Sequence, residues 1–457
     1  MKKNKIYQFL SSKGLLLIIL LAFVIRMSFF ISLQPWNKEV VNHKILSQYS
    51  DEIGYHQRAL TLIINKSFKD FDAFRTPVYP IFIALIYSIS SCSVWLVLLI
   101  QIFISIISVW LIYKITSKIF SRKIGLLSAL LYAIDIPQAL YTVYLLTDTL
   151  FVLLFLAAIY FLCNIMKKNG LTSICISAIF LGLATLVRPI SFLFPFIVVF
   201  FILVFSNLKL KKRLVYSLLF IICSIITISP WLLRNYSKYG EAKLSSISGY
   251  NLLFYNVADT EMHKTGKPID LINKNFYALA IKQGMDTTDM YSFRNSQIFS
   301  NIATHYIKEN FIFYCKRHII GIVNLYVGIG TSEINSIFHL KTSNHFEPTG
   351  TGGILTQINN YFKAKTAYEL VFNFTIGLYL LISYVFALYA IVHLIRKKEN
   401  HVFLFVLIIL YFSVLTGVVG ITRYRLPIMP FINILCAVGL FYFYDKVKAK
   451  SLSAKNY

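Results

Sequence analysis

Long apolar runs separated by short polar connections dominate the sequence. A helix needs about 20 apolar residues to cross a bilayer. Runs close to that length, which we interpret as membrane spans, cover residues 14–33, 94–113, 124–145, 147–166, 172–187, 190–206, 214–233, 367–394, 402–421 and 426–444. The first run is too long for a cleaved signal peptide and lacks a small-residue cleavage site. The pattern therefore predicts an all-α polytopic membrane protein with about ten transmembrane helices.

Composition supports a membrane protein and excludes other classes. Of the 457 residues, 57% are hydrophobic and 14% are charged, so lipid must be the solvent for most of the surface. The net charge of +26 is typical of nucleic-acid binders, but here the basic residues form short runs between apolar stretches. The expected partner is the lipid bilayer and not nucleic acid. The six cysteines have no spacing that suggests zinc or a disulfide framework.

The basic residues predict the orientation of the spans, because short cytoplasmic connections collect Lys and Arg. Connections on one side, including both ends of the chain, hold 21 of them; they are residues 2–13, 114–123, 167–168, 209–213, 396–398 and 446–455. The short connections of the other side hold three: Arg188, Arg423 and Arg425. We expect a multi-pass protein of the cell (plasma or inner) membrane, with both termini cytoplasmic and its active site extracytoplasmic.

One apolar segment, residues 78–89, is short for a span and begins among prolines. Counting it as a crossing would put the later basic connections outside, so we expect it to lie on the outer surface. The predicted organisation is a transmembrane catalytic module at 1–233 with an outer juxtamembrane loop at 33–93. A small extracytoplasmic domain follows at 234–366, with a flexible Gly/Thr-rich stretch at 349–353, and transmembrane helices return at 367–457.

Acidic residues give the first indication of chemistry. Asp135 and Asp148 are the only carboxylates between Arg75 and Glu241, and an acid within a membrane segment is costly. Asp148 opens a span on its outer side, where it could cap the helix or face a binding cavity. Asp51 and its neighbour Glu52 follow the first span; they could complement a helix dipole or act in catalysis.

Two outer acids can hold an acceptor hydroxyl, take its proton, or bind a divalent cation. The sequence itself requires no metal or other cofactor. Four arginines lie near prolines on the same side, at positions 75, 188, 423 and 425. Each could simply extend its charge to the interface, or together they could clamp a phosphate, whose oxygens match guanidinium geometry.

Two further charges lie inside predicted spans. Arg26 and Asp135 are at similar depths, roughly 17–18 Å from the inner ends of their spans at 1.5 Å per residue. An unpaired charge at this depth is costly, so one hypothesis is that they neutralise each other. The alternative is that each faces an aqueous cavity separately.

Several motifs resemble the GT-C superfamily of integral-membrane glycosyltransferases, over roughly residues 10–445. They are the acid pair Asp51-Glu52, Arg75-Thr-Pro-Val-Tyr-Pro80, Leu146-Thr-Asp-Thr-Leu-Phe151, Leu186-Val-Arg-Pro189, Pro230-Trp-Leu-Leu-Arg-Asn-Tyr236, Ser245-Ser-Ile-Ser-Gly-Tyr-Asn-Leu252 and Arg423-Tyr-Arg-Leu-Pro427. The most similar branch contains the protein O-mannosyltransferases and the lipid A aminoarabinose transferase.

This resemblance implies a glycosyltransferase that uses a polyprenyl-phosphate-linked sugar donor at the extracytoplasmic face. Asp51 matches the family's catalytic acid, Glu52 its neighbour and Asp148 the second acid near the acceptor. Arg75 stands where relatives carry a Lys before two prolines, and Thr76 replaces the first proline. The acceptor, whether lipid, glycan or protein, stays open.

Two other functions remain as alternatives. A lipid-linked-sugar flippase or other transporter would favour charges at the membrane midplane on broken helices in related halves. The acids here lie mostly toward one face, and no related halves are evident. A structural or assembly factor would not need outer acids and arginines together.

Overall fold

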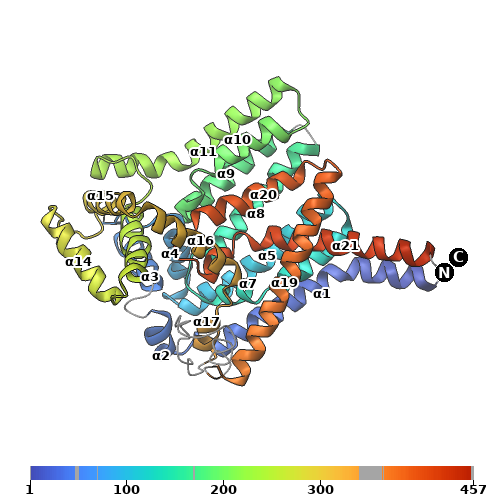
Figure 1. The fold of residues 1–457 in the computed structure, drawn as a ribbon, viewed down its shortest axis with the longest axis horizontal. Coiled ribbons are helices and arrows are strands. Elements are labelled where there is room, and N and C mark those ends of the chain that lie inside the picture. Colours follow the sequence, from blue (N-terminus) through green and yellow to red (C-terminus); the bar gives the residue numbers. More distant parts are fainter. Residues whose placement is uncertain are drawn as a thin grey trace.

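The computed structural model describes residues 2–46, 51–68, 70–167, 170–338, 363 and 365–453, and these residues form helices joined by short connections, with no strand among them. The Gly/Thr-rich stretch at 349–353 lies outside the described residues. Both chain ends lie at one end of the molecule, whereas α3, α14 and α15 lie at the other (Figure 1). The prediction of an all-α polytopic membrane protein is confirmed.

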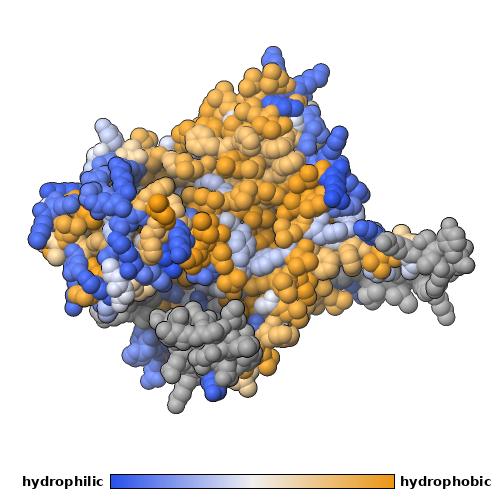
Figure 2. Space-filling view, in the orientation of Figure 1, coloured by the Kyte–Doolittle hydropathy of each residue, from blue (hydrophilic) through white to orange (hydrophobic). Residues whose placement is uncertain are grey.

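Among the described residues, six helices are long and apolar enough to cross a membrane. They are α1 (Lys2–Leu33), α5 (Val94–Ile119), α8 (Asp148–Lys167), α11 (Leu210–Tyr239), α19 (Ala367–Arg396) and α21 (Met429–Ser453). Three other predicted spans are shorter helices: α9 (Leu171–Val187), α10 (Phe194–Phe205) and α20 (His401–Leu415). Figure 2 shows a broad hydrophobic surface over α9, α10, α11 and α20 that separates polar regions at the two ends.

The predicted span at 124–145 is not one continuous helix. It comprises α6 (Arg122–Ala133), α7 (Ile136–Leu140) and the 3-10 turn η2 (Tyr141–Val143), with a bend of 64° at the break. Pro137 cannot donate a backbone hydrogen bond to the preceding turn. The Asp135 carboxylate instead caps α7 by accepting from Gln138 N at 3.3 Å. If the bent pair counts as one span, the described residues hold up to seven spans by length and composition.

Arg26 and Asp135 do not form the expected direct ion pair within 4.0 Å, although both are fully buried. Arg26 donates to the Ser105 hydroxyl at 2.8 Å and to the carbonyls of Ala22 and Ala133. Asp135 also accepts at its second oxygen from Tyr379 and Asn433, at 3.2 and 3.4 Å. Arg26 and Asp135 therefore make their hydrogen bonds to separate sets of neighbours, and Arg26 Nη2 has no hydrogen-bond partner among the described residues.

Shorter helices gather at the end opposite the chain termini. The predicted surface segment at 78–89 is α4 (Val78–Ser90), which packs against α3 (Asp51–Asn65) and α5. After α11 the chain forms α12 (Ile247–Tyr250), η4 (Asn251–Val257), α13 (Ala258–Thr265), α14 (Ile269–Lys282), α15 (Phe293–Glu309), α16 (Phe311–Val327) and α17 (Thr331–Ile337). Leu253, Phe254, Val257 and Phe299 belong to a small apolar core of their own within this part. A polar region with its own core thus covers one end of the membrane helices.

Candidate active site

Five of the predicted site residues meet where helices begin or end. Asp51 is the first residue of α3, and Asp148 is the first residue of α8. Arg75 lies in the connection just before α4, and Arg188 directly follows α9. Arg423 lies in η5 (Thr422–Arg425), a 3-10 turn between α20 and α21. Both carboxylates therefore lie at helix N-termini, where the backbone dipole favours negative charge.

The five side chains form a continuous row of alternating charge. Arg75 Nη2 donates to Asp51 Oδ1 at 2.5 Å, and Arg423 Nη1 donates to Asp51 Oδ2 at 2.8 Å. Arg423 Nε donates to Asp148 Oδ2 at 2.8 Å, and Arg188 donates to the other oxygen of Asp148. Three guanidinium groups and two carboxylates leave this row with a net positive charge, which favours an anionic ligand.

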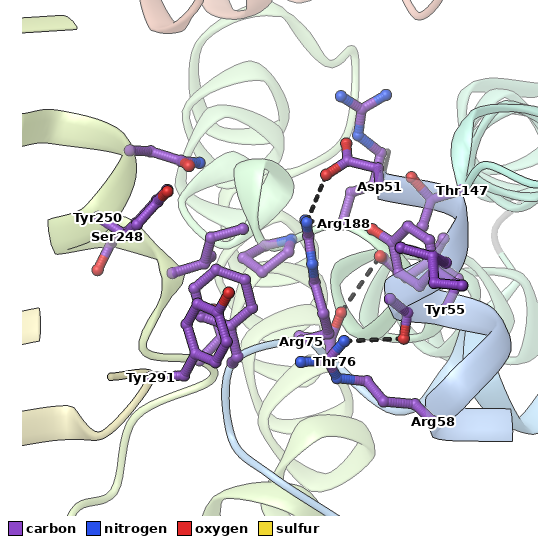
Figure 3. A pocket seen from close by; sticks show the side chains of 18 of the residues that line it. Asp51, Tyr55, Arg58, Arg75, Thr76, Thr147, Arg188, Ser248, Tyr250 and Tyr291 are labelled. Carbon is purple, nitrogen blue, oxygen red and sulfur yellow. Dashed lines mark hydrogen bonds and ion pairs between the residues drawn. The ribbon is translucent and has the colours of Figure 1, made fainter. Parts of the chain in front are cut away.

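The row borders a large cavity of about 1540 Å³. Asp51, Arg75, Arg188 and Arg423 line it directly. Figure 3 shows Arg75 reaching toward Asp51, with Tyr250 and Tyr291 on the opposite wall. The cavity is large enough for a phosphate, a sugar and part of an acceptor together, since ligand pockets for drug-sized molecules span about 300–1,000 Å³.

The two aspartates have different environments. Asp51 lines the cavity and its side chain is 36% exposed, whereas the Asp148 side chain is 1% exposed, does not line the cavity and lies beneath Arg188 and Arg423. Burial alone would raise the pKa of Asp51, but the positive charges of Arg75 and Arg423 outweigh it and hold that pKa well below its usual range. Asp51 is thus an ionised, accessible carboxylate, and Asp148 is a buried counter-ion.

Glu52 and Arg425 do not line the cavity. Glu52 is buried on another face of α3 and lies near the tyrosines Tyr79 and Tyr144. Arg425 is also buried; its Nη1 donates to the carbonyls of Leu325 and Tyr326, at 3.0 and 2.8 Å. Successive residues of a helix point about 100° apart, and Glu52 is buried while Asp51 lines the cavity.

Sequence reasoning missed a second ion pair in the cavity wall. Arg58 donates from two nitrogens to the two carboxylate oxygens of Asp72, at 3.0 and 2.6 Å. Tyr55 also lines the cavity, and the Arg75 guanidinium lies 5.1 Å from its ring centre. Tyr55 and Arg58 follow Asp51 by four and seven residues, which is the spacing of one helix face. That spacing is the signal that could have identified them.

Three aromatic rings form the wall opposite Asp51. Phe74 and Tyr291 lie 4.2 Å apart between ring centres, and Phe74 and Tyr250 lie 5.9 Å apart. Ser248 and Asn251 add polar groups beside them. The pKa of the Tyr250 hydroxyl is raised, mainly by burial, so it stays a neutral hydrogen-bonding group. Apolar ring faces next to hydroxyl and amide groups suit a ligand with both C–H faces and hydroxyls.

The cavity has an apolar side as well. Val187 and Ile190, next to Arg188, line it together with Leu415, Val419 and Ile421. Phe192 and Leu193 continue this apolar surface outward and are about half exposed.

No group of three or more His, Cys, Asp or Glu side chains within the described ranges could hold a metal ion. A divalent cation at Asp51 or Asp148 would have to displace a guanidinium group.

Residues 74–233 match the family model described as dolichyl-phosphate-mannose-protein mannosyltransferase. A search of the curated proteins found no significant match. Among solved structures, the chain is similar to the oligosaccharyltransferase AglB from Archaeoglobus fulgidus in complex with an inhibitory peptide and a dolichol-phosphate. The TM-score is 0.55 at 14% identity, over 98% of this chain and 52% of that one.

A second structure of the archaeal enzyme, tethered to an acceptor peptide, has a TM-score of 0.54 at 14% identity and covers 97% of this chain and 51% of that one. ArnT from Cupriavidus metallidurans, bound to undecaprenyl phosphate, has a TM-score of 0.40 at 12% identity, over 93% of this chain and 77% of that one. This chain spans about half the length of the archaeal enzyme. Residues 74–233 thus resemble the dolichyl-phosphate-mannose-protein mannosyltransferase family, and the chain as a whole shares the fold of the archaeal oligosaccharyltransferase.

Proposed function

We propose that the chain transfers a sugar from a polyprenyl-phosphate-linked donor to a lipid, glycan or protein acceptor at the extracytoplasmic membrane face. The observation that carries this proposal is the position of Asp51, an accessible carboxylate held between Arg75 and Arg423 on the wall of a large cavity. Sugar transfer from a lipid phosphate requires a base for the acceptor hydroxyl and cations for the departing phosphate, and this site offers a carboxylate beside several arginines.

Arg75, Arg188 and Arg423 are proposed to bind the donor phosphate. All three line the cavity, and each guanidinium can offer two parallel N–H donors to phosphate oxygens. Negative charge grows on the phosphate as the sugar leaves, so these cations stabilise the transition state more than the bound donor. Arg425 is not proposed for this role, because it does not line the cavity and its Nη1 donates to the carbonyls of Leu325 and Tyr326.

Asp51 is proposed to act as the general base. The acceptor oxygen forms a bond to the anomeric carbon, while the bond between that carbon and the phosphate oxygen breaks and its electron pair stays on the phosphate. The acceptor proton passes to Asp51. While both arginines contact Asp51, its low pKa makes it a weak base. A donor phosphate that recruits Arg75 and Arg423 would draw them from Asp51 and raise its basicity.

The lipid tail of the donor is proposed to leave the cavity along its apolar side. Ile190, Leu415 and Val419 line that side, and Phe192 and Leu193 extend it toward the lipid. The sugar would then lie toward Phe74, Tyr250 and Tyr291. Support for this class of donor comes from the matched family, described by dolichyl-phosphate-mannose, and from the archaeal structure that contains a dolichol-phosphate.

The proposal can be tested by reconstituting the purified protein with polyprenyl-phosphate sugars. Mass analysis of lipid, glycan and peptide acceptors then detects any transferred sugar. We expect a sugar adduct on one acceptor class and loss of that adduct in Asp51→Asn. Release of the sugar-linked lipid to the opposite leaflet without any adduct would instead support the transporter alternative.

The proposed side of the membrane has a separate test. Single cysteines at the exposed positions 264 and 274, in α13 and α14, should react with an impermeant thiol reagent added outside intact cells. A cysteine at position 211, in the first turn of α11, should react only after permeabilisation. The reverse pattern would contradict an extracytoplasmic active site.

A further inference from the structure

A second, smaller cavity of about 260 Å³ lies between α19 and α21. Tyr389, Val392, His393 and Arg396 line it from α19, and Tyr442 and Lys446 line it from α21. Lys446 lies 17 residues beyond Met429, the start of α21, which is roughly 25 Å along the helix axis. The cavity therefore lies at the opposite end of the membrane helices from Asp51, toward the chain termini (Figure 1).

Aromatic rings hold the imidazole of His393 in place within this cavity. The ring centres of His393 and Tyr442 are 4.4 Å apart, and Tyr389 stacks on His393 at 6.1 Å. The His393 Nε2 atom is buried and has no hydrogen-bond partner among the described residues. A buried polar atom without a partner usually indicates a bound water or ligand that satisfies it.

Three cations lie close to the His393 side chain: Arg396, Lys397 and Lys446. Arg396 and Lys446 line the cavity, and Lys397 Nζ lies 4.7 Å from the centre of the Tyr442 ring. Two carboxylates, Glu399 and Asp445, lie close to Tyr442. Within the part of the chain that the structure describes, neither makes an ion pair within 4.0 Å with Arg396 or Lys446. The cavity therefore carries positive charge that these carboxylates do not directly neutralise.

The packing of the two helices creates this cavity. One turn before Tyr442, Gly439 lies against the backbone of α19; a Cβ there would come within 2.0 Å of the Phe386 carbonyl. The helices therefore touch at Gly439, and beyond it the bulkier rings of Tyr389 and Tyr442 hold them apart. Val392, Ile395 and Phe443 beside the cavity are each about half exposed, so its rim is apolar.

We propose that this cavity binds the phosphate of an anionic phospholipid headgroup in the inner leaflet. Arg396 can contact the phosphate in bidentate fashion, Lys446 supplies a point charge, and His393 can donate a hydrogen bond from Nε2. The apolar rim contacts the acyl chains, which a soluble phosphate would not use. Basic pockets between transmembrane helices are a known way of binding such headgroups. This site is separate from the donor site and does not depend on the proposed transfer.

Native mass spectrometry of the full chain, titrated with phosphatidylglycerol or with phosphatidylcholine, tests the proposal. The double variant Arg396→Gln/Lys446→Gln should bind phosphatidylglycerol at least about tenfold more weakly than the wild type, since each basic residue near a membrane surface contributes about 1 kcal/mol. The matched control is Lys211→Gln/Lys212→Gln, which removes two exposed basic residues from the start of α11. It should bind like the wild type.

His393→Leu distinguishes a built site from general attraction between a basic surface and anionic lipid. It should weaken phosphatidylglycerol binding several-fold while leaving Arg396 and Lys446 in place. The proposal would be overturned if His393→Leu bound phosphatidylglycerol like the wild type, or if the two double variants lost the same amount of phosphatidylglycerol affinity. It would also be overturned if the wild type bound phosphatidylcholine as tightly as phosphatidylglycerol. If millimolar inorganic phosphate displaced phosphatidylglycerol, the cavity would be a site for free phosphate and not for a lipid headgroup. Size-exclusion profiles matching the wild type establish that each variant is folded.

Discussion

Arg423 Nη1 donates to Asp51 Oδ2 at 2.8 Å, although the two residues lie 372 positions apart in the sequence. The same guanidinium group also contacts Asp148 through Nε. Arg423 thus joins an aspartate that lines the cavity to one that is buried beneath it. A ligand phosphate can replace the first carboxylate at Arg423, but it cannot easily reach the second. The two aspartates should therefore respond to mutation in opposite ways.

Asp51→Asn should bind polyprenyl phosphate more tightly than the wild type while losing turnover. The wild-type carboxylate competes with the phosphate for Arg75 and Arg423, and the amide competes much less because it is neutral. Turnover should fall by about 10²–10⁴-fold, the usual loss when acid–base catalysis is removed. Native mass spectrometry with polyprenyl phosphate measures the affinity, and product formation measures turnover.

The control for Asp51→Asn is Asp259→Asn, because Asp259 pairs with Arg317 at 3.0 Å in α13 and α16 and does not line the cavity. It should leave the affinity for polyprenyl phosphate unchanged. Weaker lipid binding in Asp51→Asn would mean that Asp51 does not compete with the phosphate. Full turnover in that variant would remove Asp51 as the base.

Asp148→Asn should weaken polyprenyl phosphate binding and lower stability. Asp148 is the buried partner of both Arg188 and Arg423, so its loss leaves two guanidinium groups poorly neutralised and free to move. Breaking a buried ion pair from one side typically costs about 3–5 kcal/mol, and the shape of Asn keeps the loss toward the lower end. Thermal unfolding in detergent and lipid titration measure the two effects. Wild-type stability with lost turnover would instead assign Asp148 a direct catalytic role.

Replacement by Ala should mainly weaken lipid-phosphate binding at Arg188 and mainly lower stability at Arg425. Arg188→Ala should weaken lipid-phosphate binding, and Arg188→Lys should recover part of it because charge returns without the bidentate geometry. Arg425→Ala should mainly lower stability, by about 1–3 kcal/mol, because the buried carbonyls of Leu325 and Tyr326 lose their donor. Lipid titration and thermal unfolding of all three variants separate the roles. Normal lipid binding in Arg188→Ala would exclude that residue from the phosphate site.

The pH dependence of kcat/KM should show no acidic limb from Asp51 between about pH 5 and 8. This parameter reports ionisations of the free enzyme, in which Arg75 and Arg423 hold the pKa of Asp51 below its usual value near 3.9.

Since the pKa of Asp51 is depressed in the folded protein, the stability from this ion pair is fully present above about pH 4 and is lost only as the pH falls further. Thermal unfolding of the wild type and Asp51→Asn should therefore differ by a constant amount across about pH 5–8.

Arg75→Gln provides the comparison, because it removes one of the two cations beside Asp51. The pKa of Asp51 should rise and any acidic limb should move to higher pH. An acidic limb in the wild type near pH 6, unchanged in Arg75→Gln, would belong to another group.

The sequence by itself determined the class of the protein and most of the residues at the site. Apolar runs of about 20 residues are a local property, so they identify membrane helices without any knowledge of packing. Carboxylates and arginines are rare in such surroundings because their burial is costly, so Asp51, Asp148, Arg75, Arg188 and Arg423 stood out individually.

The tertiary structure decided which of these residues meet at the candidate site. Residues two apart in a 3-10 helix point about 240° apart, so Arg423 faces the cavity and Arg425 does not. The same kind of rotation turns Glu52 away from Asp51. Arg26 and Asp135 have matching predicted depths, yet each makes its hydrogen bonds to a separate set of neighbouring groups. Pairing depends on side-chain direction and on competing partners, and both arise only when distant segments pack.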